Sequence, residues 1–101
     1  MKSKNIVEKY KSILIKIIHK YAPNCKIYLF GSRARKKHRA GSDIDLAIES
    51  ENPIDLFTIA KMKEEIDEKT SFPLCIDIVD LSSSDKDFKN EVKRDGILWT
   101  D

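Results

Sequence analysis

The sequence predicts an α/β (α+β) fold, in which helices flank a mixed β-sheet within one small domain that spans residues 1–101. The chain is 101 residues long and 41% hydrophobic, which suits a single core. Amphipathic segments with a 3.6-residue period alternate along the chain with short runs rich in β-branched and aromatic residues. Such an alternation is typical of helices layered on a sheet, although it does not reveal which strands are parallel.

The first element is an amphipathic helix predicted over residues 6–21. Its apolar residues recur every three or four positions, and its lysines fall on the opposite side. The helix ends before Pro23, because a residue that precedes proline leaves the α region. A strand over residues 25–30 follows and stops at Gly31. Two connecting elements are expected next, a short helix over 32–37 and a loop over 38–41.

The second half of the chain continues the alternation. Residues 43–48 alternate aspartate or alanine with isoleucine or leucine, which is the period of a strand. Asn52-Pro53 is predicted to open a second helix, because proline is favoured at a first helical position. The inward stripe of that helix is predicted to be Leu56, Ile59, Ala60, the stem of Lys63, and Ile66. Residues 74–79 are predicted to form the third strand.

The last helix is predicted to begin at Ser84-Asp85, with acids in its first turn that complement the helix dipole. It carries Phe88 and Val92 on its apolar side and stops at Gly96. Residues 97–99 are expected to add a short edge strand. Trp99 fits either the core or a contact with a partner.

Composition excludes several classes of protein. No run of 18 apolar residues is present, so we expect no transmembrane helix and no membrane partner. The N-terminal residues are too interrupted by charge for a signal peptide. Cys25 and Cys75 each lie in an apolar run, and two buried, reduced thiols are expected rather than a disulfide. These features predict a cytoplasmic location.

The formal net charge of +2 conceals a polarised sequence. Residues 1–42 hold 12 lysines and arginines against one acid, whereas residues 43–101 hold 7 against 16 acids. A basic run over residues 33–39 lies just before the change of sign. Such a run suits a solvated loop, the attraction of a triphosphate, or nucleic-acid binding. Nucleic acid is disfavoured as a partner, because no aromatic residue interrupts the run.

Gly31-Ser32 is the first candidate for chemistry. Glycine lets a ligand approach the backbone closely, and a following helix start offers unpaired N–H groups to a phosphate. Alone, the same pair is more often an ordinary turn with a helix cap.

Asp43 and Asp45 are the second candidate. Two residues apart on a strand, their carboxylates share one face at about 7 Å between Cα atoms. Like charges so close favour a bound cation, and Mg²⁺ prefers carboxylate and phosphate oxygens. The alternative is a strand with one solvated face.

Asp77 is the third candidate, because it interrupts an otherwise apolar run. We expect it on a buried central strand, where a carboxylate needs a cation, a hydrogen-bond partner or an open cleft. Asp80 is the competing acid, but it should face the other way and fits a turn before Ser82. If the three candidates meet at one sheet edge, they form a two-metal phosphoryl-transfer site.

The stretch Gly31-Ser32, ten residues, then Asp43-Ile44-Asp45 resembles the signature of the DNA polymerase β-like nucleotidyltransferase superfamily. The surrounding residues resemble its small single-domain branch, the minimal nucleotidyltransferases, and Asp77 matches the third carboxylate of the family. The resemblance implies catalytic aspartates that hold two Mg²⁺ ions: Asp43, Asp45 and Asp77. It also implies a nucleotide-binding set: Gly31, Ser32, Arg33, Arg35 and Ser42.

The same resemblance implies an activity. Family members transfer a nucleoside monophosphate from a triphosphate to a hydroxyl, here AMP from ATP. Members of this length commonly pair with a HEPN-domain toxin, and known examples attach AMP to a tyrosine of that toxin. This chain therefore resembles an antitoxin that forms a hetero-oligomer with its toxin; a homodimer stays open.

Two alternatives accompany that interpretation. Lys36 stands where the family usually has glycine, so the chain could neutralise its toxin by contact alone, without catalysis. Transfer to a small molecule is the other, although related enzymes of that kind usually carry a further domain or subunit for the acceptor.

Overall fold

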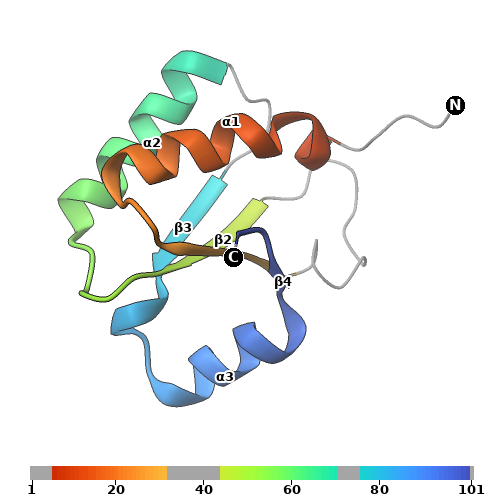
Figure 1. Ribbon diagram of the computed structural model, residues 1–101, viewed down its shortest axis with the longest axis vertical. Helices are drawn as coiled ribbons and strands as arrows, with labels where there is room; N and C mark the ends of the chain where they lie inside the picture. Colours follow the sequence, from red (N-terminus) through yellow and green to blue (C-terminus); the bar gives the residue numbers. More distant parts are fainter. Residues whose placement is uncertain (1–5, 32–43, 71–75, 101) are drawn as a thin grey trace, which may run out of the picture.

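The computed structural model describes residues 6–31, 44–70 and 76–100, with side chains from Tyr10 onward. Its elements follow in the order α1 (Ile6–Tyr21), β1 (Lys26–Phe30), β2 (Ile44–Glu49), α2 (Leu56–Thr70), β3 (Ile76–Asp80), a 3₁₀ turn η1 (Leu81–Ser83), α3 (Lys86–Asp95) and β4 (Ile97–Leu98) (Figure 1). The short helix and loop predicted over residues 32–41 lie outside the described residues.

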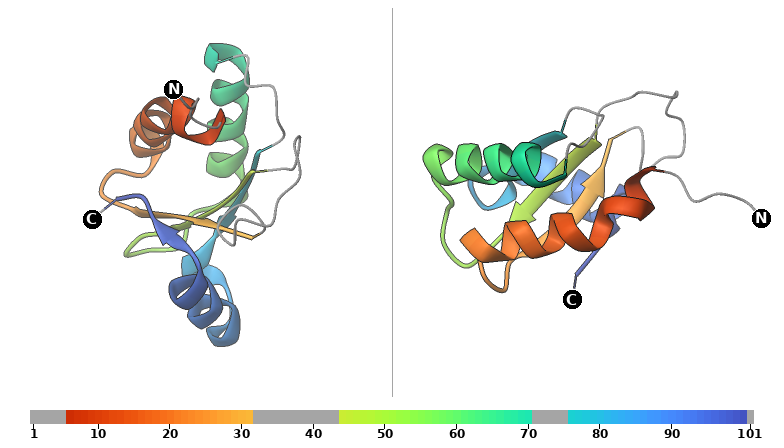
Figure 2. Two further views of the ribbon diagram at one scale, coloured as in Figure 1. Left: turned by 90° about the vertical axis from the view of Figure 1, so that its right-hand side faces the viewer. Right: turned by 90° about the horizontal axis from the view of Figure 1, so that it is seen from above.

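The four described strands form one mixed sheet in the order β3-β2-β1-β4. β1 pairs antiparallel with β2 and with β4, whereas β2 and β3 are parallel. Figure 2 shows α1 and α2 on one face of this sheet and α3 on the other. The predicted mixed sheet with flanking helices is confirmed.

The main core lies between the sheet and the α1–α2 layer. Leu14 and Ile18 of α1, Met62 of α2, and Ile27 and Leu46 of the sheet are fully buried there. A smaller cluster lies under α3 and consists of Tyr28, Ala47, Leu81 and Val92, with Phe30, Val79 and Phe88 packed against it. The face that carries α3 is therefore less completely covered by apolar side chains.

The prediction that Asn52-Pro53 opens the second helix was wrong. α2 begins at Leu56, because Asp55 caps it: Oδ1 of Asp55 accepts a hydrogen bond from Thr58 N at 2.7 Å. That bond lowers the pKa of Asp55. Leu56 was also misplaced, since it is 82% exposed rather than buried.

The buried stripe of α2 differs from the predicted one beyond its first turn. It consists of Ile59, Met62, Glu65 and Ile66, and Ala60 is exposed. The stripe therefore runs one helical row away from the predicted side, which places a charged residue, Glu65, in the helix interface.

Several predictions of the element ends are confirmed. α1 has the predicted bounds, Asp85 caps α3 by accepting from Phe88 N at 2.8 Å, and Gly96 ends it. β4 is an edge strand of the described sheet. Trp99 packs against the main core and donates its backbone N–H to Ile27 O at 2.7 Å.

Cys25 is a buried free thiol, as expected, and burial raises its pKa to about 11. Cys75 lies outside the described residues. None of the helices in the described part of the chain is long and apolar enough to cross a bilayer.

Candidate active site

The turn after β1 brings the backbone of Gly31 against the carboxylate of Asp45. Gly31 has a φ of +78°, a left-handed conformation that glycine adopts readily and other residues do not. A Cβ atom added at Gly31 would collide with Oδ2 of Asp45 and lie 3.3 Å from its Cγ. Backbone conformation and lack of space therefore both require glycine here.

Asp45 and Asp77 lie side by side on one face of the sheet. They are register partners on the parallel strands β2 and β3, so their Cα atoms are about 4.8 Å apart. Ile44 and Ile78, their neighbours along the chain, belong to the core under α1 and α2. By alternation the two carboxylates point to the α3 face, at the end of the sheet where Gly31 terminates β1.

The environment of Asp77 corrects one expectation. It is not on a central strand, because β3 is an edge of the described sheet. Its side chain is 59% exposed, and its nearest described cation is Lys63 of α2, with Nζ 3.9 Å from Oδ1. Asp77 is therefore accessible to a ligand from the β3 side without burial of a lone charge.

Asp80 has the structural role predicted for it. Its carboxylate accepts hydrogen bonds from Ser82 N at 3.0 Å, Ser83 Oγ at 2.6 Å and Ile54 N at 2.9 Å. These bonds cap η1 and fix the segment before α2. The carboxylate of Asp80 is thus engaged in hydrogen bonds within the protein, whereas Asp77 lies at the candidate site.

Five of the residues singled out for the site lie outside the described part of the chain: Ser32, Arg33, Arg35, Ser42 and Asp43. Within that part, no group of three or more histidine, cysteine or acidic side chains forms a metal cluster. The described donors still suit Mg²⁺, because two neighbouring carboxylates supply hard oxygen ligands and their like charges favour a cation between them. We judge that the pair fits the metal.

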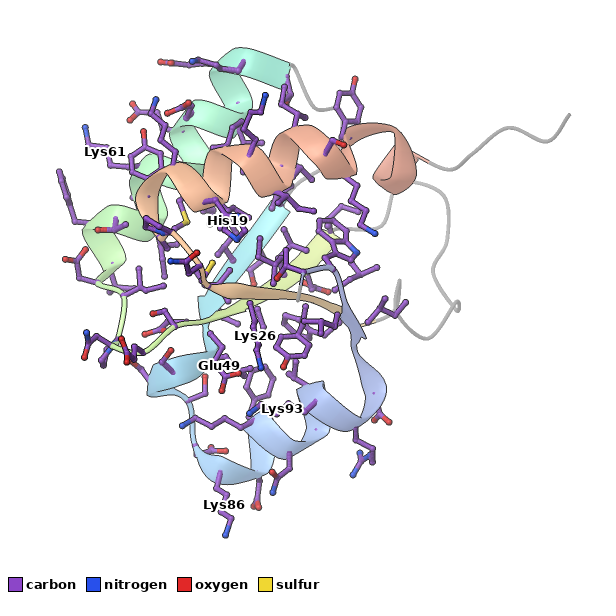
Figure 3. All side chains as sticks on the ribbon, in the orientation of Figure 1. His19, Lys26, Glu49, Lys61, Lys86 and Lys93 are labelled. Carbon is purple, nitrogen blue, oxygen red and sulfur yellow. The ribbon has the colours of Figure 1, made fainter. Side chains whose placement is uncertain are left out.

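At the opposite end of β2, another acid on this face, Glu49, stabilises the fold through an ion pair. Glu49 lies on the same face as Asp45 and is bound by Lys93 of α3, with Nζ 3.0 Å from Oε2 (Figure 3). This hydrogen bond raises the pKa of Lys93. It joins α3 to the sheet and leaves Glu49 with a partner supplied by the fold.

A small pocket that sequence reasoning missed adjoins Gly31. It has a volume of about 200 Å³ and lies between the end of β1 and the C-terminal half of α3. Phe30 and Phe88 supply aromatic lining, and Glu91 and Asp95 supply carboxylates. The signal was in the sequence, since positions 88, 91, 92 and 95 share one side of a helix.

The other polar cluster that was missed lies in the seam between α1 and α2. Glu65, whose side chain is 11% exposed, accepts hydrogen bonds from Tyr21 at 2.5 Å and from Lys20 at 3.0 and 3.1 Å. Lys69 Nζ lies 3.4 Å from its second oxygen. The bond from Tyr21, with help from the lysines, lowers the pKa of Glu65 to about 2.

A larger pocket of about 950 Å³ lies over that seam. It contains none of the candidate site residues, and its polar lining is mostly lysine together with the paired Glu65. Pocket volume alone would therefore place the site over the α1–α2 seam and not at the carboxylates. The adjacent aspartates Asp45 and Asp77 and the constrained backbone of Gly31 are the stronger indication of a site.

Comparison with known proteins identifies the family of this chain. Residues 4–100 match the family model described as polymerase beta, nucleotidyltransferase. The chain is 31% identical over 83 residues to a probable protein adenylyltransferase MntA of Haemophilus influenzae, a match that covers 82% of this chain and 72% of that protein.

Two solved structures share the fold. One is a toxin–antitoxin with AMP-PNP, with a TM-score of 0.74 and 24% identity over 89% of this chain and 72% of the other. The second is a tri-AMPylated Shewanella oneidensis HEPN toxin in complex with an MNT antitoxin, with a TM-score of 0.69 and 22% identity over 92% and 71%. The family match along nearly the whole chain, together with the sheet that joins Gly31, Asp45 and Asp77, establishes that the protein belongs to the polymerase β nucleotidyltransferase family.

Proposed function

We propose that this protein is a Mg²⁺-dependent adenylyltransferase that moves AMP from ATP to a tyrosine hydroxyl of a partner HEPN toxin and so acts as an antitoxin. The observation that carries the proposal is the pair Asp45 and Asp77, aligned on one face beside the constrained backbone of Gly31. The name of the Haemophilus relative, a probable protein adenylyltransferase, supports the same activity and a protein as acceptor.

The proposed reaction is an in-line displacement at the α-phosphorus. The acceptor oxygen forms a bond to phosphorus, the bond between the α- and β-phosphates breaks, and pyrophosphate leaves. The proton of the acceptor hydroxyl passes to Asp77 or to water. The protein contributes mainly position and charge, as is general in phosphoryl transfer.

Each site residue has a distinct part in this scheme. Gly31 and Ser32 hold the phosphates, and Arg33, Arg35 and Ser42 complete the nucleotide contacts. Asp43 and Asp45 hold the two Mg²⁺ ions, with Asp77 completing one site. The ions, when bound, supply positive charge that stabilises the attacking and leaving oxygens.

Asp77 also defines where the acceptor enters. It lies on the edge strand β3 and is exposed, so a tyrosine from another protein can approach it from outside the sheet. This exposure of Asp77 supports a partner protein as the acceptor. We place the reaction in the cytoplasm, where the free thiol of Cys25 stays reduced.

The test combines the full chain, ATP labelled at the α-phosphate, Mg²⁺ and the product of the neighbouring gene. We expect label to appear on the partner and to depend on Asp45 and Asp77, each replaced by asparagine. Asp87→Asn, an exposed change on α3, is the matched control. Label transfer that survives both site variants would contradict the proposal. Protection of cells by the inactive variants would instead show that contact alone neutralises the partner.

A further inference from the structure

A groove between α1 and α2 carries chemistry that the proposed reaction does not use. It has a volume of about 950 Å³ and lies over the seam where the two helices meet. Ile13, one of its lining residues, is a large apolar side chain that stays 37% exposed. Figure 1 shows the C-terminal end of α2 rising past α1. We call this surface the seam groove; its lining includes Ile13, Ile15, Lys16, Lys20, Glu65 and Lys69.

The polar rim of the seam groove is positively charged. Among the described residues that line it, three lysines stand against one carboxylate, Glu65. Glu65 accepts two hydrogen bonds from Lys20 and lies 3.4 Å from Nζ of Lys69, so it holds both ammonium groups at the rim. Lys16, one turn before Lys20, is exposed. The groove thus combines an apolar floor with an excess of positive charge, which favours an anionic amphipathic partner.

The excess of lysine is local to the groove. α2 also carries three exposed acids, Glu64, Asp67 and Glu68, yet none of these three lines the groove, whereas Lys69 does. The charges of α2 are therefore sorted, with its basic side chain toward the groove and these acids away from it. Such sorting provides an electrostatic preference for an acidic surface at this one place.

The size and lining of the groove suit a helix of another protein. A helical turn about 5.4 Å long and about 10 Å across fills about 400 Å³, so the groove accommodates about two turns. A third helix that packs between two others buries its apolar stripe in the ordinary way. Nucleic acid is also anionic, but an aliphatic floor such as Ile13 and Ile15 offers its bases no aromatic ring for stacking.

α2 separates the seam groove from Asp77. Lys63 lies near Asp77, whereas Glu65, two residues further along α2, bonds to Tyr21 of α1. Two residues correspond to about 200° around a helix. The groove and Asp77 therefore lie on opposite sides of α2, about 10 Å apart across the helix. A partner held in the groove leaves Asp77 uncovered and reaches it by passing around α2.

We propose that the seam groove docks an acidic amphipathic helix of the partner protein, with its apolar side against Ile13 and its carboxylates at Lys16 and Lys69. The proposal rests on the proposed function for the identity of the partner. It adds a separation of binding from chemistry: the groove holds the partner, whereas the carboxylates at the sheet edge carry out the transfer.

The test uses the full chain and the product of the neighbouring gene. Lys16→Glu places a negative charge in the groove and should weaken binding, measured by calorimetry, about tenfold. The KM for the partner should rise about as much, while kcat and the KM for ATP stay unchanged. Ile13→Ser removes apolar contact and should weaken binding about fivefold. Lys86→Glu, the same change at an exposed lysine of α3, is the matched control and should alter none of these (Figure 3).

A photo-crosslinking residue introduced at Ser12 identifies what occupies the groove. Ser12 is exposed and lines the groove, so we expect a covalent product with one segment of the partner. That segment, identified by mass spectrometry, should be rich in aspartate and glutamate and have apolar residues at helical spacing. A crosslinked segment without acids would overturn the acidic occupant.

Three results would overturn the docking surface. They are unchanged partner binding in Lys16→Glu, equal losses in Lys16→Glu and Lys86→Glu, and self-association of the chain alone that Lys16→Glu abolishes, which would assign the groove to a second copy. In each case, label transfer that depends on Asp45 persists. Partner binding that depends on Lys16 without any transfer would overturn the proposed function and support the groove. Absence of partner binding by the wild type would overturn both.

Discussion

Two groups of acidic side chains in this molecule have opposite environments. In the seam between α1 and α2, Glu65 is nearly buried and holds donors from Tyr21, Lys20 and Lys69. At the end of the sheet, Asp45 and Asp77 are register partners on neighbouring strands, and Nζ of Lys63 lies 3.9 Å from Asp77. The fold surrounds the first acid with hydrogen-bond donors, whereas it places two carboxylates side by side at the second place.

The difference teaches how to separate an acid that stabilises the protein from acids that serve a ligand. A carboxylate with a depressed pKa and donors from two elements lowers the free energy of the folded state. Two adjacent carboxylates at an accessible edge raise it, and that cost is offset when a cation binds. Removing one acid of each kind should therefore change stability in opposite directions.

The largest expected effect is that of Asp45→Asn. Because this change removes a proposed metal ligand, we expect adenylyl transfer to fall at least about a hundredfold. Thermal stability without Mg²⁺ should stay equal or rise, since a like-charge contact with Asp77 is relieved. Initial rates and Tm measured on the same samples check this. A marked fall in Tm would show that Asp45 stabilises the fold as Glu65 does, which contradicts the distinction between the two kinds of acid.

Gly31→Ala comes next. The new Cβ collides with the Asp45 carboxylate and sits on a backbone at φ +78°, so both the turn and the carboxylate must shift. We expect a stability loss of about 1 kcal/mol and a fall in transfer of about tenfold. Urea unfolding and rate measurements are the readouts. Full activity would show that Asp45 does not need its present position.

Glu65→Gln tests the structural acid. It weakens charge-assisted hydrogen bonds from Lys20 and Tyr21, so we expect Tm to fall by about 5 °C with little change in the rate of transfer at a temperature where both proteins are folded. Glu68→Gln, an exposed change on the same helix, is the control and should leave Tm nearly unchanged.

Glu65 should also leave a signature in acid. Its pKa in the folded protein is about 2 against a reference of 4.5, so its stabilising effect is fully present above about 4.5. That effect is lost as the pH falls toward 2. The difference in Tm between the wild type and Glu65→Gln should therefore narrow over this window. A difference in Tm that stays constant with pH would mean that Glu65 stabilises the protein through packing and not through its negative charge.

The smallest expected effect belongs to Lys63. Its ammonium group competes with Mg²⁺ for Asp77. The ion pair between them is weak, because both side chains are exposed and the two atoms are 3.9 Å apart. Lys63→Met should lower the Mg²⁺ concentration for half-maximal transfer about twofold. Lys61→Met, whose lysine lies over the ring of Phe57 instead, is the matched control (Figure 3). Mn²⁺ binding followed by electron paramagnetic resonance provides a second readout. A higher metal requirement would show that Lys63 assists the metal.

The sequence predicted what depends on local periodicity. Alternation placed Asp45 away from Ile44, and the caps at Asp85 and Gly96 followed from residue chemistry. It could not place Asp77, because exposure depends on strand order, and order is a property of the whole sheet. Glu65 was missed because its donors Lys20 and Tyr21 are more than 40 residues away in the chain.

The metal ligand Asp43 and the nucleotide contacts Ser32, Arg33, Arg35 and Ser42 remain predictions from the sequence. Their assignment rests on a family signature whose other members, Gly31, Asp45 and Asp77, do lie together. Three of the eight candidate site residues are thus supported by their position in the sheet, and the other five rest on resemblance.

The pairing of β4 with β1 has a consequence for how the molecule acquires its active form. β4 contains only Ile97 and Leu98, yet it completes the sheet beside β1, and Trp99 and Thr100 bind Ile27 next to it. Closing a loop of about 70 residues for so few hydrogen bonds makes this a late step in folding. In hydrogen exchange, the amides of β4 should therefore open before those of β2, so that the C-terminal edge of the sheet separates from β1 while the rest of the sheet stays paired.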